Sequence, residues 1–390
     1  MTASPPLHVY LVAAEESGDR LGAALMRALK TRAGTTIRFA GVGGHHMAAE
    51  GLALRLSTGD LAVTGFVSLF GVLFRALKLI RDTANDIAAQ RPDVLVIIDS
   101  PEFTLRVAKR LRAIAPQIPI VEYVSPSVWA WRPWRARAMR GYIDRVMALL
   151  PFEPDVHKRL GGPACTFVGH PLADQVDTLR PREGEAARRN ETPPIVLLMP
   201  GSRRSELDRM LDLFEGVAQQ IEQRTGPAEF VMPAVPSVAA RLRAAVAKWP
   251  TPVRIVESAA EKQAAFHAAR AAIVKSGTGT LELALAGIPM VALYKVSAIE
   301  AVIFRRLISA PSAILTNLIL GENAVPEFLQ EDATVEKIVE AALPLLGDTP
   351  QRRAQLQAFR RLDAVMEIGK VSPSDRAAAI VMEMAKRNAG

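Results

Sequence analysis

Two glycine-containing loops in the second half of the chain have the residue types and spacing of a phosphate-binding site. MPGSRRSEL (199–207) and KSGTGTLELALAGIP (275–289) each follow a short apolar run and lead into a predicted helix. A helix that begins directly after a strand presents unpaired backbone N–H groups to an anion, and glycine lets that anion approach closely. Helix capping alone would explain the serines and threonines, but not the glycines among them. We therefore predict phosphate binding by Gly201, Ser202, Arg203, Ser276, Gly277, Thr278, Gly279 and Thr280, with Glu282 placed to bind a ribose.

Carboxylates follow predicted strands in the first half of the chain. Asp99, in IDSPEF (98–103), stands at the carboxyl end of an apolar run, where a general base belongs. The alternative is that Asp99 caps the helix that follows. AEESGDRLG (14–22) and GVGGHH (41–46) lack the G-x-G-x-x-G spacing, which disfavours a nicotinamide enzyme. The six histidines show no metal-ligand spacing, so we predict neither a metal nor another cofactor.

Alternating strands and helices must position these loops. Short apolar runs separated by longer helical patterns predict parallel strands covered by helices on both faces, in two series. This pattern is typical of α/β proteins with doubly wound sheets, which bind ligands beyond the carboxyl ends of their strands. If two such sheets face each other, the cleft between them is the expected active site. The predicted strands are 8–14, 37–42, 94–99, 118–124, 145–150, 166–169, 195–200, 229–233, 253–257, 271–276 and 290–295.

A change of composition divides the two series. DTLRPREGEAARRNETPP (177–194) is polar and charged and ends in paired prolines, which predicts an interdomain linker. We therefore predict an N-terminal domain over 1–172, a linker over 173–193 and a C-terminal domain over 194–366. For the remaining residues, 367–390, we predict a helix. This helix either packs against the first domain of its own chain or exchanges between the subunits of a homodimer.

The net charge and the cysteine content limit the classes of binding partner and the cellular compartment that we expect for this protein. The formal net charge is +8 and the isoelectric point about 9.8, which suits nucleic acid, an anionic membrane face or phosphorylated substrates. YVSPSVWAWRPWR (123–135) combines tryptophan with arginine, as base-stacking or bilayer-interface loops do, but the arginines elsewhere are scattered, which disfavours nucleic acid. A single cysteine, Cys165, and the lack of a basic segment before the first apolar run predict a cytoplasmic protein.

Several motifs occur in one order along nearly the whole chain, and together they resemble those of the lipid-A-disaccharide synthases. SGTGTLE followed by AGIP is similar to the donor-binding loop of GT-B glycosyltransferases. YVSPSVWAW together with PEFLQ is the most specific part of the resemblance. The motifs are EESGD (15–19), GVGG (41–44), IDSPEF (98–103), YVSPSVWAW (123–131), GHPL (169–172), GSRRSE (201–206), SGTGTLE (276–282) and NLILGENAVPEFLQ (317–330).

The resemblance implies a GT-B fold, in which two Rossmann-like domains face each other across a cleft. It implies an inverting transfer of 2,3-diacylglucosamine from UDP to 2,3-diacylglucosamine 1-phosphate (lipid X), which yields lipid A disaccharide 1-phosphate and UDP. It adds Asn317 to the nucleotide site and makes Glu15 and Asp19 alternatives to Asp99 as the base. Two other hypotheses stay open: a soluble UDP-sugar epimerase or transferase of the same fold, and a basic nucleic-acid-binding protein.

The apolar run FVSLFGVLF (66–74) is too short to span a bilayer, which needs ~20 mostly apolar residues. One interpretation is a core helix. Because the implied substrates carry acyl chains anchored in a membrane, we favour a surface that docks on the inner membrane and contacts acyl chains, with Arg75, Lys78 and Arg81 on anionic headgroups. We thus predict a cytoplasmic protein bound peripherally to that membrane. The predicted contacts are Phe66, Val67, Leu69, Phe70, Val72, Leu73 and Phe74.

Overall fold

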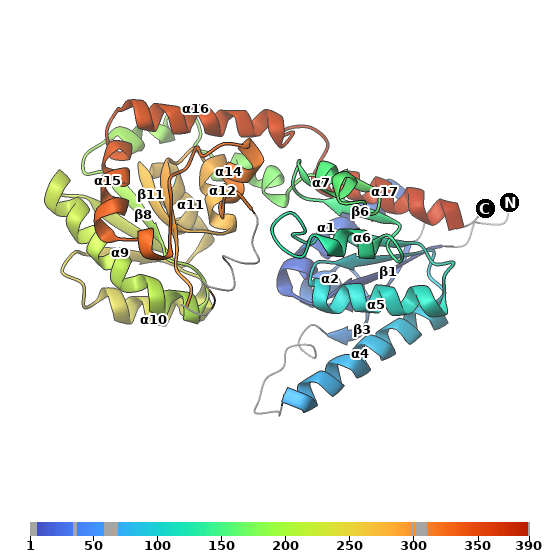
Figure 1. Cartoon of the computed structure of the whole chain (residues 1–390). Helices are drawn as coiled ribbons and strands as arrows, with labels where there is room; N and C mark the ends of the chain where they lie inside the picture. The colour runs from blue at the N-terminus through green and yellow to red at the C-terminus, as the bar shows by residue number, and fades with distance from the viewer. Residues whose placement is uncertain (1–5, 34–36, 58–68, 298–299, 301–309, 389–390) are drawn as a thin grey trace. The chain divides into compact units, whose positions relative to one another are not determined.

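The chain forms two compact units, one built from residues 1–171 with 370–390 and the other from residues 172–369. The computed structural model describes residues 6–33, 37–57, 69–297, 300 and 310–388 (Figure 1). Each unit has a single parallel sheet with helices on both faces, so the predicted α/β class with two doubly wound sheets is confirmed.

The first unit contains a seven-stranded sheet in the order β3-β2-β1-β4-β5-β6-β7. The strand order reverses between β1 and β4, so the loops after these two strands flank the switch point at which such sheets bind ligands. The strands are β1 (Leu7–Ala13), β2 (Ile37–Gly43), β3 (Ala53–Ser57), β4 (Val94–Ile98), β5 (Ile120–Tyr123), β6 (Arg145–Ala148) and β7 (Cys165–Phe167). The helices are α1 (Glu16–Ala33), α2 (His45–Ala49), α4 (Leu69–Gln90), α5 (Pro101–Ile114), α6 (Trp134–Met139) and α7 (Glu153–Arg159).

Alternate residues of the central strands face two different cores. On β1, Val9 and Leu11 pack with α1, whereas Tyr10 and Val12 pack with α4 and α5. Every residue from Val9 to Ala13 is therefore fully buried. Burial on both faces is the reason that the strands read as continuous apolar runs rather than as alternating patterns.

The helix α17 (Pro373–Asn388) belongs to the first unit although it follows the whole second unit in sequence. Its buried residues include Ala377, Val381 and Met384, which join the core formed by α1 and the sheet. The Arg32 guanidinium lies 3.4 Å from the Asp375 carboxylate at the start of the helix. The apolar face of α17 is thus covered within its own chain, where the sequence left open an exchange between subunits.

The second unit contains a six-stranded parallel sheet in the order β10-β9-β8-β11-β12-β13, and its switch point lies between β8 and β11. The strands are β8 (Ile195–Met199), β9 (Glu229–Pro233), β10 (Val253–Val256), β11 (Ala271–Lys275), β12 (Met290–Tyr294) and β13 (Glu327–Leu329). The helices are α8 (Val176–Leu179), α9 (Arg204–Thr225), α10 (Pro236–Val246), α11 (Ala259–Ala268), α12 (Thr278–Leu285), α14 (Leu315–Leu320), α15 (Val335–Leu346) and α16 (Pro350–Val365), with 3₁₀ turns η1 (Pro171–Gln175), η2 (Glu185–Asn190) and η3 (Gln330–Asp332).

The stretch 173–193, which the sequence predicts to be a linker, lies within the second unit. Two arginines attach it there. The Arg180 guanidinium donates two hydrogen bonds to the Asp363 carboxylate, at 2.6 and 3.0 Å. The Arg189 guanidinium donates to the carbonyls of Phe266, His267, Ala286 and Gly287 at 2.9–3.0 Å. The segment is polar and charged because its arginines bind backbone carbonyls and a carboxylate of the second unit, and not because it is a flexible linker.

Candidate active site

Asp99 lies at the switch point of the first unit, directly after β4. The neighbouring strand β1 ends at Ala13, which pairs with Ile98, so the loop that carries Glu15 starts beside the loop that carries Asp99. Asp99 and Ser100 both have left-handed backbone conformations, with φ of 52° and 48°. A non-glycine residue adopts this conformation at a cost in free energy, and such strain is concentrated at functional sites.

The electrostatic surroundings of Asp99 favour a proton acceptor. Burial raises the pKa of the Asp99 carboxyl above its ordinary value, and the charge of Glu15 raises it further, while a hydrogen bond from the Ser100 backbone opposes both. A carboxylate with a raised pKa is a stronger base than an exposed one. The Asp99 side chain is half-buried, and Glu15 is exposed.

Asp19 has a structural role that the sequence did not reveal. Its buried carboxylate accepts hydrogen bonds from the backbone N–H groups of Gly44, His46 and Met47 at 2.7–3.1 Å, which ties α1 to the start of α2. Asp19, His45 and His46 also place one ligand atom each within 4.8 Å of one another, as a metal site would. Because both Asp19 oxygens already accept backbone hydrogen bonds, we interpret this cluster as a cap of α2.

In the second unit, the two glycine-containing loops lie side by side at the switch point, because β8 and β11 are paired neighbours. Gly201 has a φ of 117° and Gly277 a φ of 153°. A Cβ on Gly201 would lie 2.6 Å from a Glu206 carboxylate oxygen, so a side chain at this position would displace the Glu206 carboxylate. The helices α9 and α12 begin at Arg204 and Thr278, just after these turns.

Some of the residues predicted to bind the nucleotide are exposed, and the side chains of others already form hydrogen bonds within the protein. Ser202, Arg203 and Thr278 are exposed, while Gly277 and Gly279 are half-buried. The Ser276 hydroxyl donates to the Ala313 carbonyl, and the Thr280 hydroxyl donates to the Gly277 carbonyl at 2.8 Å. The side chains of Ser276 and Thr280 therefore shape the loop, and the groups left to meet a ligand are its backbone amides, Thr278 and the turn before α9.

Glu282 and Asn317 both have partners in the structure. The Glu282 carboxylate lies 2.6 Å from the Lys262 ammonium. The buried Asn317 side-chain amide donates to the Val325 carbonyl and accepts from the Val325 N–H, at 2.9 Å each. Asn317 therefore closes the loop between α14 and β13, which is a sufficient reason for an asparagine at this position.

Sequence reasoning missed Lys275, the last residue of β11. Its ammonium lies 3.0 Å from a carboxylate oxygen of Glu206, on the first turn of α9. The same Glu206 oxygen lies 3.7 Å from the Arg203 guanidinium. Two cations from the two loops thus share one carboxylate oxygen. The signal available in the sequence was the position of Lys275 at the end of an apolar strand, where a charged residue needs a partner.

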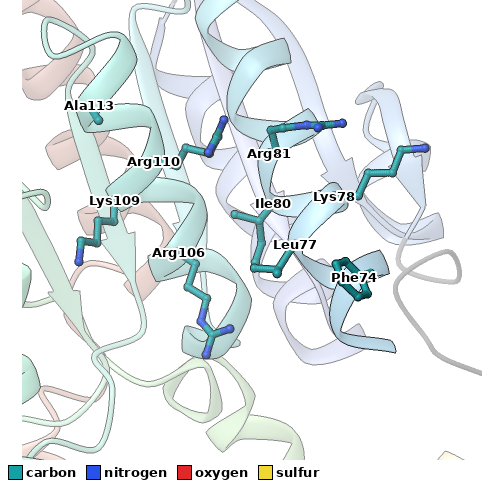
Figure 2. Close-up of a pocket in the computed structure, with 9 residues that line it drawn as sticks. All are labelled: Phe74, Leu77, Lys78, Ile80, Arg81, Arg106, Lys109, Arg110 and Ala113. Carbon is teal, nitrogen blue, oxygen red and sulfur yellow. The ribbon is translucent and has the colours of Figure 1, made fainter. Parts of the chain in front are cut away.

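A mixed apolar and basic surface covers part of α4 and α5. In Figure 2, Leu77, Ile80 and Arg110 lie between the two helices, whereas the Lys78 and Lys109 side chains point away from each other. Phe74 is 71% exposed and Leu77 49% exposed, whereas Ile80, one turn further, is buried in the core. Phe66 and Val67 lie outside the described residues, as do the side chains of Leu69, Phe70, Val72 and Leu73. In the part of the chain that the structure describes, no helix is long and apolar enough to cross a bilayer. A groove on this surface is lined by Phe74, Leu77, Lys78, Ile80, Arg81, Arg106, Lys109, Arg110 and Ala113.

Comparisons with known proteins agree with this architecture and identify relatives. The family model described as lipid-A-disaccharide synthetase matches residues 9–381. The chain is 52% identical over 381 residues to lipid-A-disaccharide synthase of Nitrobacter hamburgensis, covering 98% of this chain and 96% of that one. It is 51% identical over 376 residues to the enzyme of the same name from Rhodopseudomonas palustris, covering 96% of each.

Solved structures with similar folds include a glycosyltransferase and a putative epimerase. The calicheamicin glycosyltransferase CalG4 matches with a TM-score of 0.62 and 16% identity, over 99% of this chain and 100% of that one. A putative UDP-N-acetylglucosamine 2-epimerase from Listeria monocytogenes matches with a TM-score of 0.60 and 14% identity, over 98% and 96%. At these identities the likeness concerns the fold alone, and the predicted GT-B class is confirmed.

Proposed function

Because the chain belongs to the lipid-A-disaccharide synthetase family of glycosyltransferases, we propose that it condenses UDP-2,3-diacylglucosamine with 2,3-diacylglucosamine 1-phosphate. The products are lipid A disaccharide 1-phosphate and UDP, and the anomeric configuration inverts. The observation that carries the proposal is what lies at the two switch points: a carboxylate with a raised pKa in the first unit, and two glycine-containing turns, each followed by the start of a helix, in the second.

UDP is the leaving group, so charge develops on its diphosphate as the glycosidic bond breaks. The backbone N–H groups of 277–279 and the exposed Arg203 guanidinium are the donors proposed to stabilise that charge, with Gly201 and Ser202 in the adjoining turn. Fixed donors of this kind need little reorganisation in the transition state, and the loss of one typically lowers turnover by ~10²–10³. Glu282 is the proposed ribose ligand, and its ion pair with Lys262 would hold the carboxylate in place.

Asp99 is the proposed general base that removes the proton from the 6-hydroxyl of the acceptor. The oxygen then attacks the anomeric carbon from the face opposite UDP, which gives inversion in one displacement. The raised pKa of Asp99 and its strand-end position support this role. Asp19 is a weaker candidate, since its carboxylate caps α2, and exposed Glu15 is the remaining alternative.

Incubation of the full-length protein with both lipid substrates, followed by mass analysis, tests the reaction. We expect a disaccharide 1-phosphate and stoichiometric UDP, and Asp99→Asn should lower kcat by ~10²–10⁴, the usual contribution of a general base. Asp144→Asn is a matched control, because Asp144 lies after α6 and pairs with Arg112. Turnover of unacylated UDP-N-acetylglucosamine without lipid acceptor would instead indicate the epimerase hypothesis.

The groove between α4 and α5 is the proposed membrane-docking surface, which would place the protein peripherally on the cytoplasmic side of the inner membrane. Phe74 and Leu77 supply apolar area, each large side chain being worth ~1.5–3 kcal/mol when buried. Among the described residues, no carboxylate forms an ion pair with Lys78, Lys109 or Arg110. Their charge is therefore available to anionic headgroups, each contact contributing about 1 kcal/mol.

Sedimentation with phospholipid vesicles tests the docking surface. We expect binding to vesicles of phosphatidylcholine and phosphatidylglycerol but weaker binding to phosphatidylcholine alone. Lys109→Glu with Arg110→Glu should abolish the preference for the anionic vesicles, and Phe74→Ser with Leu77→Ser should weaken binding to both. The double variant Arg137→Glu and Arg140→Glu, on and just after α6, is the control for a change of net charge. Equal loss of binding in this control would contradict a localised surface.

A further inference from the structure

Lys275 is held where the two anion-binding turns of the second unit meet. Its side chain is only 16% exposed, and its ammonium lies 3.0 Å from the Glu206 carboxylate and 4.7 Å from the centre of the Tyr294 ring. A Cβ built on Gly277 would be 3.9 Å from this ammonium. The ammonium therefore lies beside the loop that precedes α12 and contacts the first turn of α9.

The counter-charge at this position is incomplete. Glu206, itself only 13% exposed, places one carboxylate oxygen near both the Lys275 ammonium and the Arg203 guanidinium. An ammonium has three hydrogens to donate, and one carboxylate oxygen satisfies one of them. Arg203 is 80% exposed and can turn to a ligand. Lys275 and Arg203 therefore share the single negative charge of Glu206, and the backbone N–H groups at two helix starts lie close by. Together they give this site an excess of positive potential.

We propose that Lys275 binds the diphosphate of the sugar nucleotide, and that Glu206 holds its ammonium in place until the diphosphate arrives. This inference rests on the proposed function, because it assigns a further ligand to the same nucleotide. A diphosphate at the turns of 201–203 and 277–279 would be next to the ammonium, since β8 and β11 are paired up to Met199 and Val274. The partial burial of Lys275 strengthens its attraction for an anion, because solvent screens it less.

The competing explanation is a plain structural bridge that ties α9 to β11. Such a bridge would stabilise the fold but would not distinguish one nucleotide from another. A diphosphate ligand, in contrast, matters more for UDP than for UMP, because UMP lacks the second phosphate. The ratio of the two dissociation constants therefore separates the explanations.

Isothermal titration of the full-length protein with UDP and with UMP provides the test. We expect Lys275→Met to weaken UDP binding by about ten- to a hundredfold, the range for hydrogen bonds to charged groups, and to weaken UMP binding much less. Lys275→Arg should recover part of the UDP affinity. Glu206→Gln should bind UDP more tightly than the wild type, because the carboxylate that competes with the diphosphate for the Lys275 ammonium is gone.

Lys337→Met is the matched control, because Lys337 forms an ion pair with Asp332 on the surface of the same unit, at 2.6 Å. It should leave both affinities unchanged. Equal weakening of UDP and UMP by Lys275→Met, or loss of UDP binding in Glu206→Gln, would overturn the inference in favour of the structural bridge. Wild-type binding with no effect of Lys275→Met would also overturn it. If the wild type binds neither nucleotide, the proposed function itself fails.

Discussion

At the scale of single residues, Glu122 is the least satisfied group in the described part of the first unit. It lies on the central strand β5, it is 1% exposed, and neither carboxylate oxygen has a hydrogen-bond partner. Burial raises its pKa well above the ordinary value, the charge of Asp99 adds to this effect, and Arg135 opposes it. The carboxyl is therefore neutral in the folded protein over a pH range in which it is ionised in the unfolded chain.

This difference predicts that Glu122 destabilises the fold increasingly as the pH rises. The folded state binds the extra proton above the ordinary pKa of about 4.5, so the free energy of unfolding falls by up to about 1.4 kcal/mol per pH unit between that value and the raised pKa. Glu122→Gln removes this dependence. Urea unfolding at pH 5 and pH 8 should show a larger gain in stability at pH 8, and an equal gain at both would contradict the prediction.

The raised pKa of Asp99 leads to a prediction for activity. A base must be unprotonated, so kcat/KM should fall as the pH drops through the Asp99 pKa, at a higher pH than for an ordinary aspartate. Glu15→Gln removes one of the charges that raise this pKa, so the acidic limb should move to lower pH while the plateau is kept. A pH profile of both proteins measures this shift. Loss of the plateau in Glu15→Gln would instead identify Glu15 as the base.

At the scale of elements, Gly41 allows β1 and β2 to pair. It has a φ of 150° and faces Leu11 in the register of the two strands, and a Cβ there would lie 1.8 Å from the Leu11 carbonyl oxygen. Gly41→Ala should lower the free energy of unfolding by about 3 kcal/mol or more, because the backbone must shift. Gly51→Ala is the control, since Gly51 also has a positive φ of 84° but open space around it, and it should cost only about 1 kcal/mol. Urea unfolding compares the two.

The secondary-structure elements also show how much of the fold and of the candidate site could be predicted from the sequence. The central strands were predicted because burial on both faces leaves an unbroken apolar run, whereas the short strands β3 and β13, at the sheet edges, carry too few apolar residues to stand out. The turns at 201 and 277 were predicted from their glycines. Lys275 was missed because its importance comes from Glu206, 69 residues away in sequence. The roles of Asp19 and Asn317 depend likewise on tertiary hydrogen bonds that no local pattern encodes.

At the scale of the whole molecule, the chain separates into two units with different proposed ligands. UDP should therefore slow hydrogen exchange at the amides of 201–204 and 277–280, and leave the loops 14–19 and 99–103 unchanged. Exchange followed by mass spectrometry, with and without UDP, measures this. Protection of the first unit's loops by UDP alone would contradict the assignment of the nucleotide to the second unit.

The return of α17 to the first unit constrains the order of events on the ribosome. The part of the sheet that α17 covers, over β4 and β5, stays uncovered until the ribosome has made all of residues 172–369 and then α17. The second unit is continuous in sequence and can fold as soon as it emerges. While it waits for α17, the N-terminal unit exposes apolar surface that can aggregate or bind chaperones. Slow codons or stalling within the second half of the chain should therefore lower the amount of correctly folded first unit.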